Sequence, residues 1–178
     1  MKVQKREYHF KVLNNVLLII FFVLYFFLAL GKCYNYDEAY TIGMIENTYI
    51  EILNITSRDV HSPVYYWLLK SFCMLPIGNV FVLSKLFSMI FMIAFLFTGR
   101  QICRKYYSVE IECYWLICAA WLPAMVLQST NTRMYTMALF VMTVCQWLAY
   151  ELFHNQSKLK WITFTFITIL CIYLHTFV

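Results

Sequence analysis

The feature that most constrains this chain is a run of twenty uncharged residues between Lys11 and Lys32, rich in Leu, Ile and Phe. Twenty residues of α-helix are about 30 Å long, which matches the hydrocarbon core of a bilayer. The run is longer than the apolar core of a signal peptide, roughly 7–15 residues, and no small-x-small cleavage site follows it. We therefore interpret it as a membrane anchor that the mature protein retains.

The composition indicates that further segments also cross a membrane. Of the 178 residues, 62% are hydrophobic and 13% are charged, whereas a soluble domain carries about 25% charged residues. The sequence therefore predicts one all-α domain over residues 1–178, a polytopic transmembrane helical bundle of about five spans. The expected spans are residues 12–31, 80–98, 113–132, 134–150 and 161–178.

The segment 63–75 decides the topology. It begins with Ser62 and Pro63, a typical N-cap and first helical residue, but a helix of 13 residues is only about 20 Å long. That length is too short to cross a bilayer. If the segment lies at the interface, Lys and Arg collect in the N-terminal segment and around 100–105 and 158–160, as they do in cytoplasmic loops. We therefore expect a multi-pass protein of the cell membrane with a cytoplasmic N-terminus.

In this topology, residues 32–79 form a long first external loop that contains five of the nine acidic residues of the chain. A connection of that length usually has structure of its own or a function. Its sequence pattern predicts short amphipathic helices resting at the membrane surface. We expect them at about 37–46, 49–54 and 63–75.

An acidic pair, Asp37 and Glu38, follows the first span within the run YNYDEAY. Neighbouring side chains on a helix point about 100° apart, so only one of the two can face a substrate directly. One interpretation makes Asp37 a general base or a cation ligand and Glu38 its supporting neighbour. The other is that both are solvated acids at a helix N-terminus, where the macrodipole favours negative charge. Spacing alone leaves both interpretations open.

Basic residues that suit a lipid phosphate occur at three places. Arg58 and His61 precede the helix expected from Pro63, whose N-terminus attracts anions, although an ordinary polar helix start would look the same. Arg133 lies in the second external turn, where it either clamps a phosphate or extends to the interface. Lys85 lies inside the second span, near its outer end, where the same two interpretations hold.

Four motifs in order, YDEAYT, DVHSPVYYWLLK, NTRMYTMALF and YLHTFV, are similar to the N-terminal half of a known family. They resemble the GT-C glycosyltransferases of the protein O-mannosyltransferase and lipid A aminoarabinose transferase type. The bacterial family 39-like branch is nearest, where these motifs commonly read DEAYT, DVHPPLYYLLLK, QEARMY and THYF. The resemblance extends over residues 32–178.

The resemblance implies an enzyme that takes a sugar from a polyprenyl-phosphate carrier at the outer membrane face and transfers it to an acceptor, whose identity stays open. It implies Asp37 as base or organiser of the site, with Glu38 beside it. It also places His61 near the carrier phosphate and Arg133 in the second external motif. The remaining site residues by this resemblance are Asn131, Tyr135 and His175.

Two departures from the family pattern bear on activity. Asn131 stands where the family usually has an acid. An amide cannot act as a base, and it coordinates a cation less well than a carboxylate does. Members of the family also generally have many more spans. The alternative is therefore a non-catalytic membrane protein, either a degenerate fragment or a subunit that binds lipid or a partner.

The expected partners are a polyprenyl-phosphate-linked sugar and membrane lipid, and not nucleic acid. The cofactor is left open: a divalent cation is compatible with the site, with Asp37 as its ligand. We also expect Asp37, His61 and Arg133 to gather around one polar cavity at the outer face, because all three are assigned to the same membrane surface.

Overall fold

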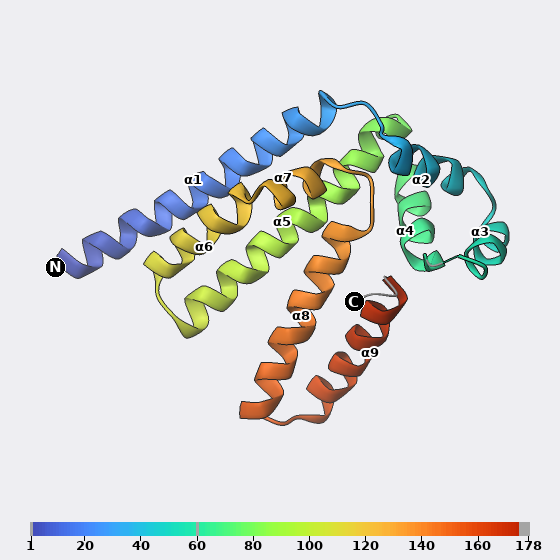
Figure 1. Cartoon of the computed structure of the whole chain (residues 1–178). Helices are drawn as coiled ribbons and strands as arrows, with labels where there is room; N and C mark the ends of the chain where they lie inside the picture. Colours follow the sequence, from blue (N-terminus) through green and yellow to red (C-terminus); the bar gives the residue numbers. More distant parts are fainter. Residues whose placement is uncertain (1, 60, 175–178) are drawn as a thin grey trace.

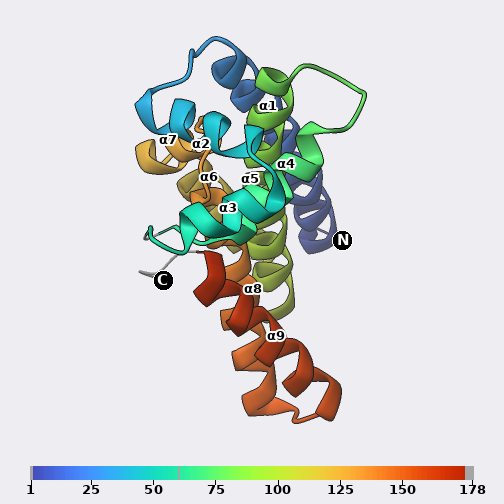
Figure 2. The same cartoon turned by 90° about the vertical axis from the view of Figure 1, so that its right-hand side faces the viewer.

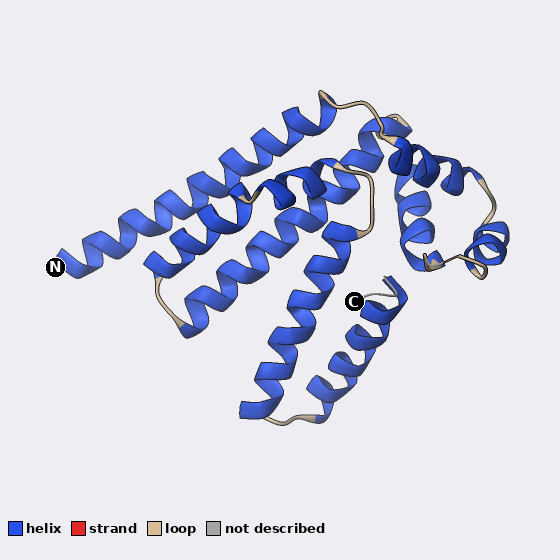
Figure 3. Ribbon diagram, in the orientation of Figure 1, coloured by secondary structure: helices blue, strands red, loops and turns tan. Residues whose placement is uncertain are grey.

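The computed structural model describes residues 2–59 and 61–174, which contain nine α-helices and no strand (Figure 3). The prediction of an all-α fold is therefore confirmed for this part of the chain. The helices are α1 (Lys2–Leu30), α2 (Tyr36–Glu46), α3 (Tyr49–Thr56), α4 (Pro63–Cys73), α5 (Val80–Tyr106), α6 (Val109–Trp121), α7 (Pro123–Thr130), α8 (Tyr135–His154) and α9 (Lys158–Leu174).

The long helices form a bundle in which successive passes alternate in direction (Figures 1 and 2). Helix α6 packs between α1 and α5, and α8 packs between α5 and α9. The short helices α2, α3 and α4 gather at the end of the bundle where α5 begins. We call this the α2–α4 end. It also receives the C-terminal ends of α1 and α7 and the beginning of α8.

Within the described residues, three helices are long and apolar enough to cross a membrane: Arg6–Leu30 of α1, α5 and α8. The pair α6 and α7 adds a fourth span if the two are counted together, although they are bent by 64° relative to each other. The described part of α9 has 17 residues. The fifth expected span, 161–178, continues past Leu174 and so ends outside the described residues. The chain is thus a helical membrane protein.

The expected span 113–132 is broken in the structure, because α6 ends at Trp121 and α7 begins at Pro123. Proline has no N–H to donate to the carbonyl one turn before it, and its ring prevents a straight continuation. The Tyr25 hydroxyl of α1 donates a hydrogen bond of 2.7 Å to the carbonyl of Ala120 next to this break. A side chain from a neighbouring helix therefore satisfies a carbonyl near the end of α6.

Three of the long helices extend beyond the expected spans: α1 begins ten residues earlier, at Lys2, α8 ends four residues later, at His154, and α5 is also longer. Helix α5 continues from the expected end at residue 98 to Tyr106, with Arg104 and Lys105 in its last turn. Cations at a helix C-terminus are favoured by the macrodipole, and long basic side chains reach past the end of a span. The short helix predicted over 63–75 covers Pro63–Cys73, with proline at its first turn as expected.

Two clusters of buried apolar side chains hold the bundle together. One joins α1, α5 and α6 through residues such as Phe21, Met92 and Leu116. Gly99 belongs to this contact, because a Cβ added there would overlap the ring of Trp115. The other cluster joins the short helices to α5, α8 and α9; it includes Met44, Ile52, Tyr65, Leu69, Phe87, Met137 and Leu174. The α2–α4 end is therefore packed onto the bundle rather than separate from it.

Candidate functional site

A fully buried ion pair joins Glu38 of α2 to Lys85 in the second turn of α5. Lys85 also donates a hydrogen bond of 2.8 Å to the carbonyl of Thr130 at the end of α7. Its ammonium thus points inward, so the sequence-based alternative that Lys85 extends to the membrane interface is not what the structure shows. A buried ion pair of this kind is favourable only when further hydrogen bonds satisfy its remaining polar groups.

Backbone donors supply those further bonds to Glu38. The N–H of Thr132 donates to one carboxylate oxygen at 2.6 Å, and the N–H of Asn35 donates to the other at 3.0 Å. Burial alone raises the pKa of Glu38, but the hydrogen bonds from Lys85 and from the two backbone groups outweigh it, so the pKa lies below its ordinary value. Glu38 therefore stays ionised and connects three segments of the chain.

Arg133 forms a second connection at the same end of the bundle. It is 6% exposed, and its NH1 group donates to the backbone carbonyl of Asp37 and to the Thr41 hydroxyl, both at 3.3 Å. Its NH2 group lies 3.1 Å from Nε2 of His61. The guanidinium therefore points into the protein rather than extending to the interface.

The contact with Arg133 indicates which ring nitrogen of His61 accepts a hydrogen bond. A guanidinium only donates hydrogen bonds, so Nε2 of His61 accepts. The ring proton then lies on Nδ1, which is 3.3 Å from a carboxylate oxygen of Asp59. The same Asp59 oxygen accepts a bond of 3.0 Å from the Tyr40 hydroxyl. In this network His61 is thus assigned as the acceptor for Arg133 and the donor to Asp59.

Asp37 lies beside this network with its side chain exposed. Its backbone carbonyl binds Arg133, but its carboxylate makes no hydrogen bond or ion pair to the described residues. The acidic pair thus divides as the helical geometry requires, with one acid inward and one outward. The sequence predicted Glu38 as the supporting neighbour of Asp37; in the structure Glu38 forms the buried ion pair, and Asp37 is the exposed acid.

The remaining predicted site residues lie around the same centre, with two exceptions. Asn131 accepts a hydrogen bond of 2.5 Å from Lys32 through Oδ1, and the guanidinium of Arg133 lies 5.9 Å from the ring centre of Tyr135. Arg58 is exposed in the turn after α3. His175 lies outside the described residues. Lys32 was not among the predicted site residues, although its position just after the first span was a signal for it.

Several buried polar atoms near Arg133 have no hydrogen-bond partner among the described residues. They are Nε of Arg133 itself, the hydroxyl of Tyr66, the hydroxyl of Thr136 and the hydroxyl of Ser62. Burial raises the pKa of the Tyr66 phenol, and the positive charge of Arg133 acts in the opposite direction. An unpaired buried polar group costs about 1–3 kcal/mol unless a water or a ligand satisfies it. These four groups are therefore candidates for hydrogen bonds to buried water.

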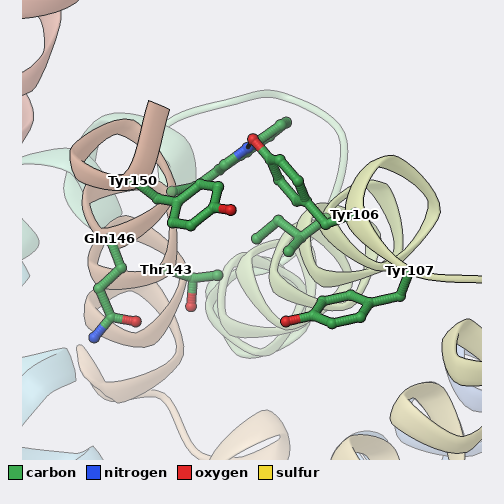
Figure 4. A pocket seen from close by; sticks show the side chains of 7 residues that line it. Tyr106, Tyr107, Thr143, Gln146 and Tyr150 are labelled. Carbon is green, nitrogen blue, oxygen red and sulfur yellow. Dashed lines mark hydrogen bonds between the residues drawn. The ribbon is translucent and has the colours of Figure 1, made fainter. Parts of the chain in front are cut away.

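Two features lie at the other end of α5, away from the predicted site. A pocket of about 230 Å³ opens between α5 and α8 and is lined by Tyr106, Tyr107, Thr143, Gln146 and Tyr150, together with Ile102 and Trp147 (Figure 4). Beside it, Glu151 of α8 pairs with Lys105 and Lys160. This network joins α8 to the end of α5 and to the start of α9.

No cluster of three His, Cys, Asp or Glu side chains with the spacing of a metal site occurs within residues 2–59 and 61–174. The assignment of Asp37 as the ligand of a divalent cation stays a prediction. No protein-family model matches the chain, and neither a curated protein nor a solved structure matches it. The site itself and the sequence motifs are therefore the basis for a proposed function.

Proposed function

We propose that this protein is a membrane glycosyltransferase of the GT-C type, or the N-terminal part of one. It would transfer a sugar from a polyprenyl-phosphate carrier to an acceptor at the outer membrane face. In this proposal the α2–α4 end faces outward and the N-terminus is cytoplasmic. The observation that carries the proposal is the exposed carboxylate of Asp37 on a residue whose backbone carbonyl binds the buried cation of Arg133.

The reaction is a displacement at the anomeric carbon of the sugar. The acceptor hydroxyl attacks this carbon, its proton passes to the Asp37 carboxylate, and the bond between the anomeric carbon and the phosphate oxygen breaks. The carrier phosphate leaves with the bonding electrons and gains negative charge, which Arg133 stabilises. General-base catalysis contributes about 10²- to 10⁴-fold, and the remaining acceleration comes from charge stabilisation and positioning.

The other residues have supporting roles in this proposal. Glu38 and Lys85 hold the start of α2 against the segment that carries Arg133, so they position the site rather than touch the substrate. His61 accepts from Arg133 and orients its guanidinium.

The test uses the full chain, purified and reconstituted in nanodiscs, with radiolabelled sugars on polyprenyl phosphate as donors and membrane extracts as the source of acceptors. Asp37→Asn is expected to lower transfer about 10²- to 10⁴-fold without changing the fold. Glu46→Gln, which removes an exposed acid from the far end of the same helix, is the matched control and is expected to retain activity.

The non-catalytic alternative makes a different prediction in the same assay. The family usually has an acid at the position of Asn131. Here the position holds an amide whose oxygen accepts a hydrogen bond from Lys32, and this observation favours the non-catalytic alternative. If the folded wild-type protein releases no sugar from any donor, and Asp37→Asn behaves like the wild type, the chain is not a transferase on its own. Transfer that survives Asp37→Asn would instead contradict the assignment of the base.

A further inference from the structure

A groove of about 480 Å³ lies between the end of α1 and the bent helix α7. Its walls are apolar, from Leu28 on one side and Pro123, Val126 and Leu127 on the other. The 64° bend at Pro123 tilts α7 away from the direction of α6. Leu127 is 51% exposed, so the apolar surface of this groove is open to a ligand.

The polar end of the groove carries a cation without a carboxylate partner. Lys32, which lies two residues past the end of α1, lines the groove together with Thr130. Within the described part of the chain its ammonium forms no ion pair, and its one hydrogen bond is to Oδ1 of Asn131. A cation at the end of an apolar groove, at the expected boundary of the hydrocarbon core, is complementary to an amphiphile with an anionic head.

Two further donors lie on the same segment as this cation. The Asn131 amide uses its oxygen to accept from Lys32, so its NH₂ group remains to donate, and it has no acceptor among the described residues. Two positions further on is Arg133, which likewise has no carboxylate partner within the described ranges and whose buried Nε is unpaired. The segment 131–133 thus connects the groove to the acid Asp37 through Arg133.

We propose that this groove holds the lipid carrier of the reaction, with Lys32 and the Asn131 amide binding the carrier phosphate and the first isoprenoid units lying against Leu28, Pro123 and Leu127. The inference rests on the proposed function and adds to it a phosphate-binding residue, Lys32, and a path for the lipid chain. A phosphate bound by Lys32 and Asn131 would lie at the segment that also carries Arg133, whose guanidinium binds the backbone of Asp37. An ordinary phospholipid takes no part in the proposed reaction, so it would not need a binding site beside Asp37 and Arg133.

The experiment measures binding rather than turnover. Polyprenyl phosphate without a sugar is titrated onto the full chain in nanodiscs, and its Kd is compared among variants. Lys32→Gln is expected to raise the Kd roughly tenfold or more, because it removes a charge-assisted hydrogen bond. Leu127→Trp, which fills the groove, is expected to raise the Kd as well. The matched controls are Lys158→Gln and Ile169→Trp, an exposed lysine and a half-exposed apolar residue elsewhere.

The outcomes separate this inference from the proposed function. Unchanged binding in both Lys32→Gln and Leu127→Trp would overturn the inference, even if the protein transfers sugar. Selective loss of binding in these variants would support it, even if no sugar is transferred and the proposed function fails. If phosphatidylglycerol displaces polyprenyl phosphate with equal affinity, the groove is a general lipid site and the assignment to the carrier is wrong. Thermal unfolding of each variant checks that it is folded.

Discussion

Helices α2 and α3 begin with the same local arrangement of groups, yet only one of these beginnings holds the protein together. In α2 the N-cap is Asn35 and the third helical residue is Glu38; in α3 they are Thr48 and Glu51. Both pairs form a capping box, in which each side chain bonds the backbone N–H of the other residue.

The difference lies in what surrounds each glutamate. Glu51 is exposed, and among the described residues its carboxylate binds Thr48 alone, through the backbone N–H and the hydroxyl. Glu38 is fully buried, and besides Asn35 it binds Lys85 and the N–H of Thr132. A short sequence motif therefore specifies where a helix starts, while its surroundings decide whether the same motif also joins distant segments.

The largest effect is expected from Lys85→Met. This substitution leaves the Glu38 carboxylate buried without its cation, and breaking a buried pair in this way costs about 3–5 kcal/mol. Denaturant unfolding of the reconstituted protein measures the loss. Lys158→Met, at an exposed position, is the control and should change stability little. Equal stability of the two variants would mean that the pair contributes nothing to the fold.

The second expected effect is a loss of stability in acid that depends on Glu38. Because its pKa is lower in the folded protein than its ordinary value of 4.5, Glu38 contributes stability that is fully present above about pH 4.5 and is lost as the pH falls through the folded pKa. Thermal melting of wild type and Glu38→Gln between pH 7 and pH 3 measures this. The variant should be less stable at neutral pH, and the difference should shrink in acid. A constant difference would contradict the assignment.

A smaller effect is expected when the two N-caps are compared directly. Thr48→Ala removes a cap that acts on α3 alone, at a cost of about 0.5–1 kcal/mol. Asn35→Ala should cost more, about 2 kcal/mol, because Asn35 also holds the helix turn that carries Glu38. Denaturant unfolding of both variants decides the order. If Thr48→Ala lowers the free energy of unfolding as much as Asn35→Ala does, the burial of Glu38 does not make the N-cap of α2 more stabilising than that of α3.

The smallest effect on stability is expected from Asp37→Asn. Asp37 is exposed in the first turn of α2, where a negative charge is worth less than about 1 kcal/mol. The melting temperature should therefore stay close to that of the wild type, while the transfer reaction proposed above should be lost. A large drop in melting temperature would show that the carboxylate has a structural partner after all.

The elements of the fold could largely be predicted because the signals are local. Ser62 and Pro63 mark the start of α4, and the length of the apolar runs marks α1, α5 and α8. The break before Pro123 was not predicted, since the flanking residues are apolar enough to read as one span. Pro123 inside this apolar run was the signal from which the break could have been predicted.

The structure shows where the motif residues lie, and their roles in a site stay predictions. The motifs identified Asp37, Glu38, His61 and Arg133, and the structure brings all four together. Which acid points inward could not be read from the sequence, because it depends on Lys85, 47 positions away, and on Thr132, 94 positions away. Only tertiary packing brings such distant groups into contact.

The contacts of Glu38 and Lys85 with the segment 130–132 are made to backbone atoms, namely the Thr132 N–H and the Thr130 carbonyl. Backbone atoms are the same in nearly every residue type, so the identity of these two threonines is not what the pair recognises. Over evolutionary time the side chains at 130 and 132 can vary with little effect on the ion pair. An insertion or deletion in this turn, by contrast, would move both groups out of register, so its length is expected to be fixed where its sequence is not.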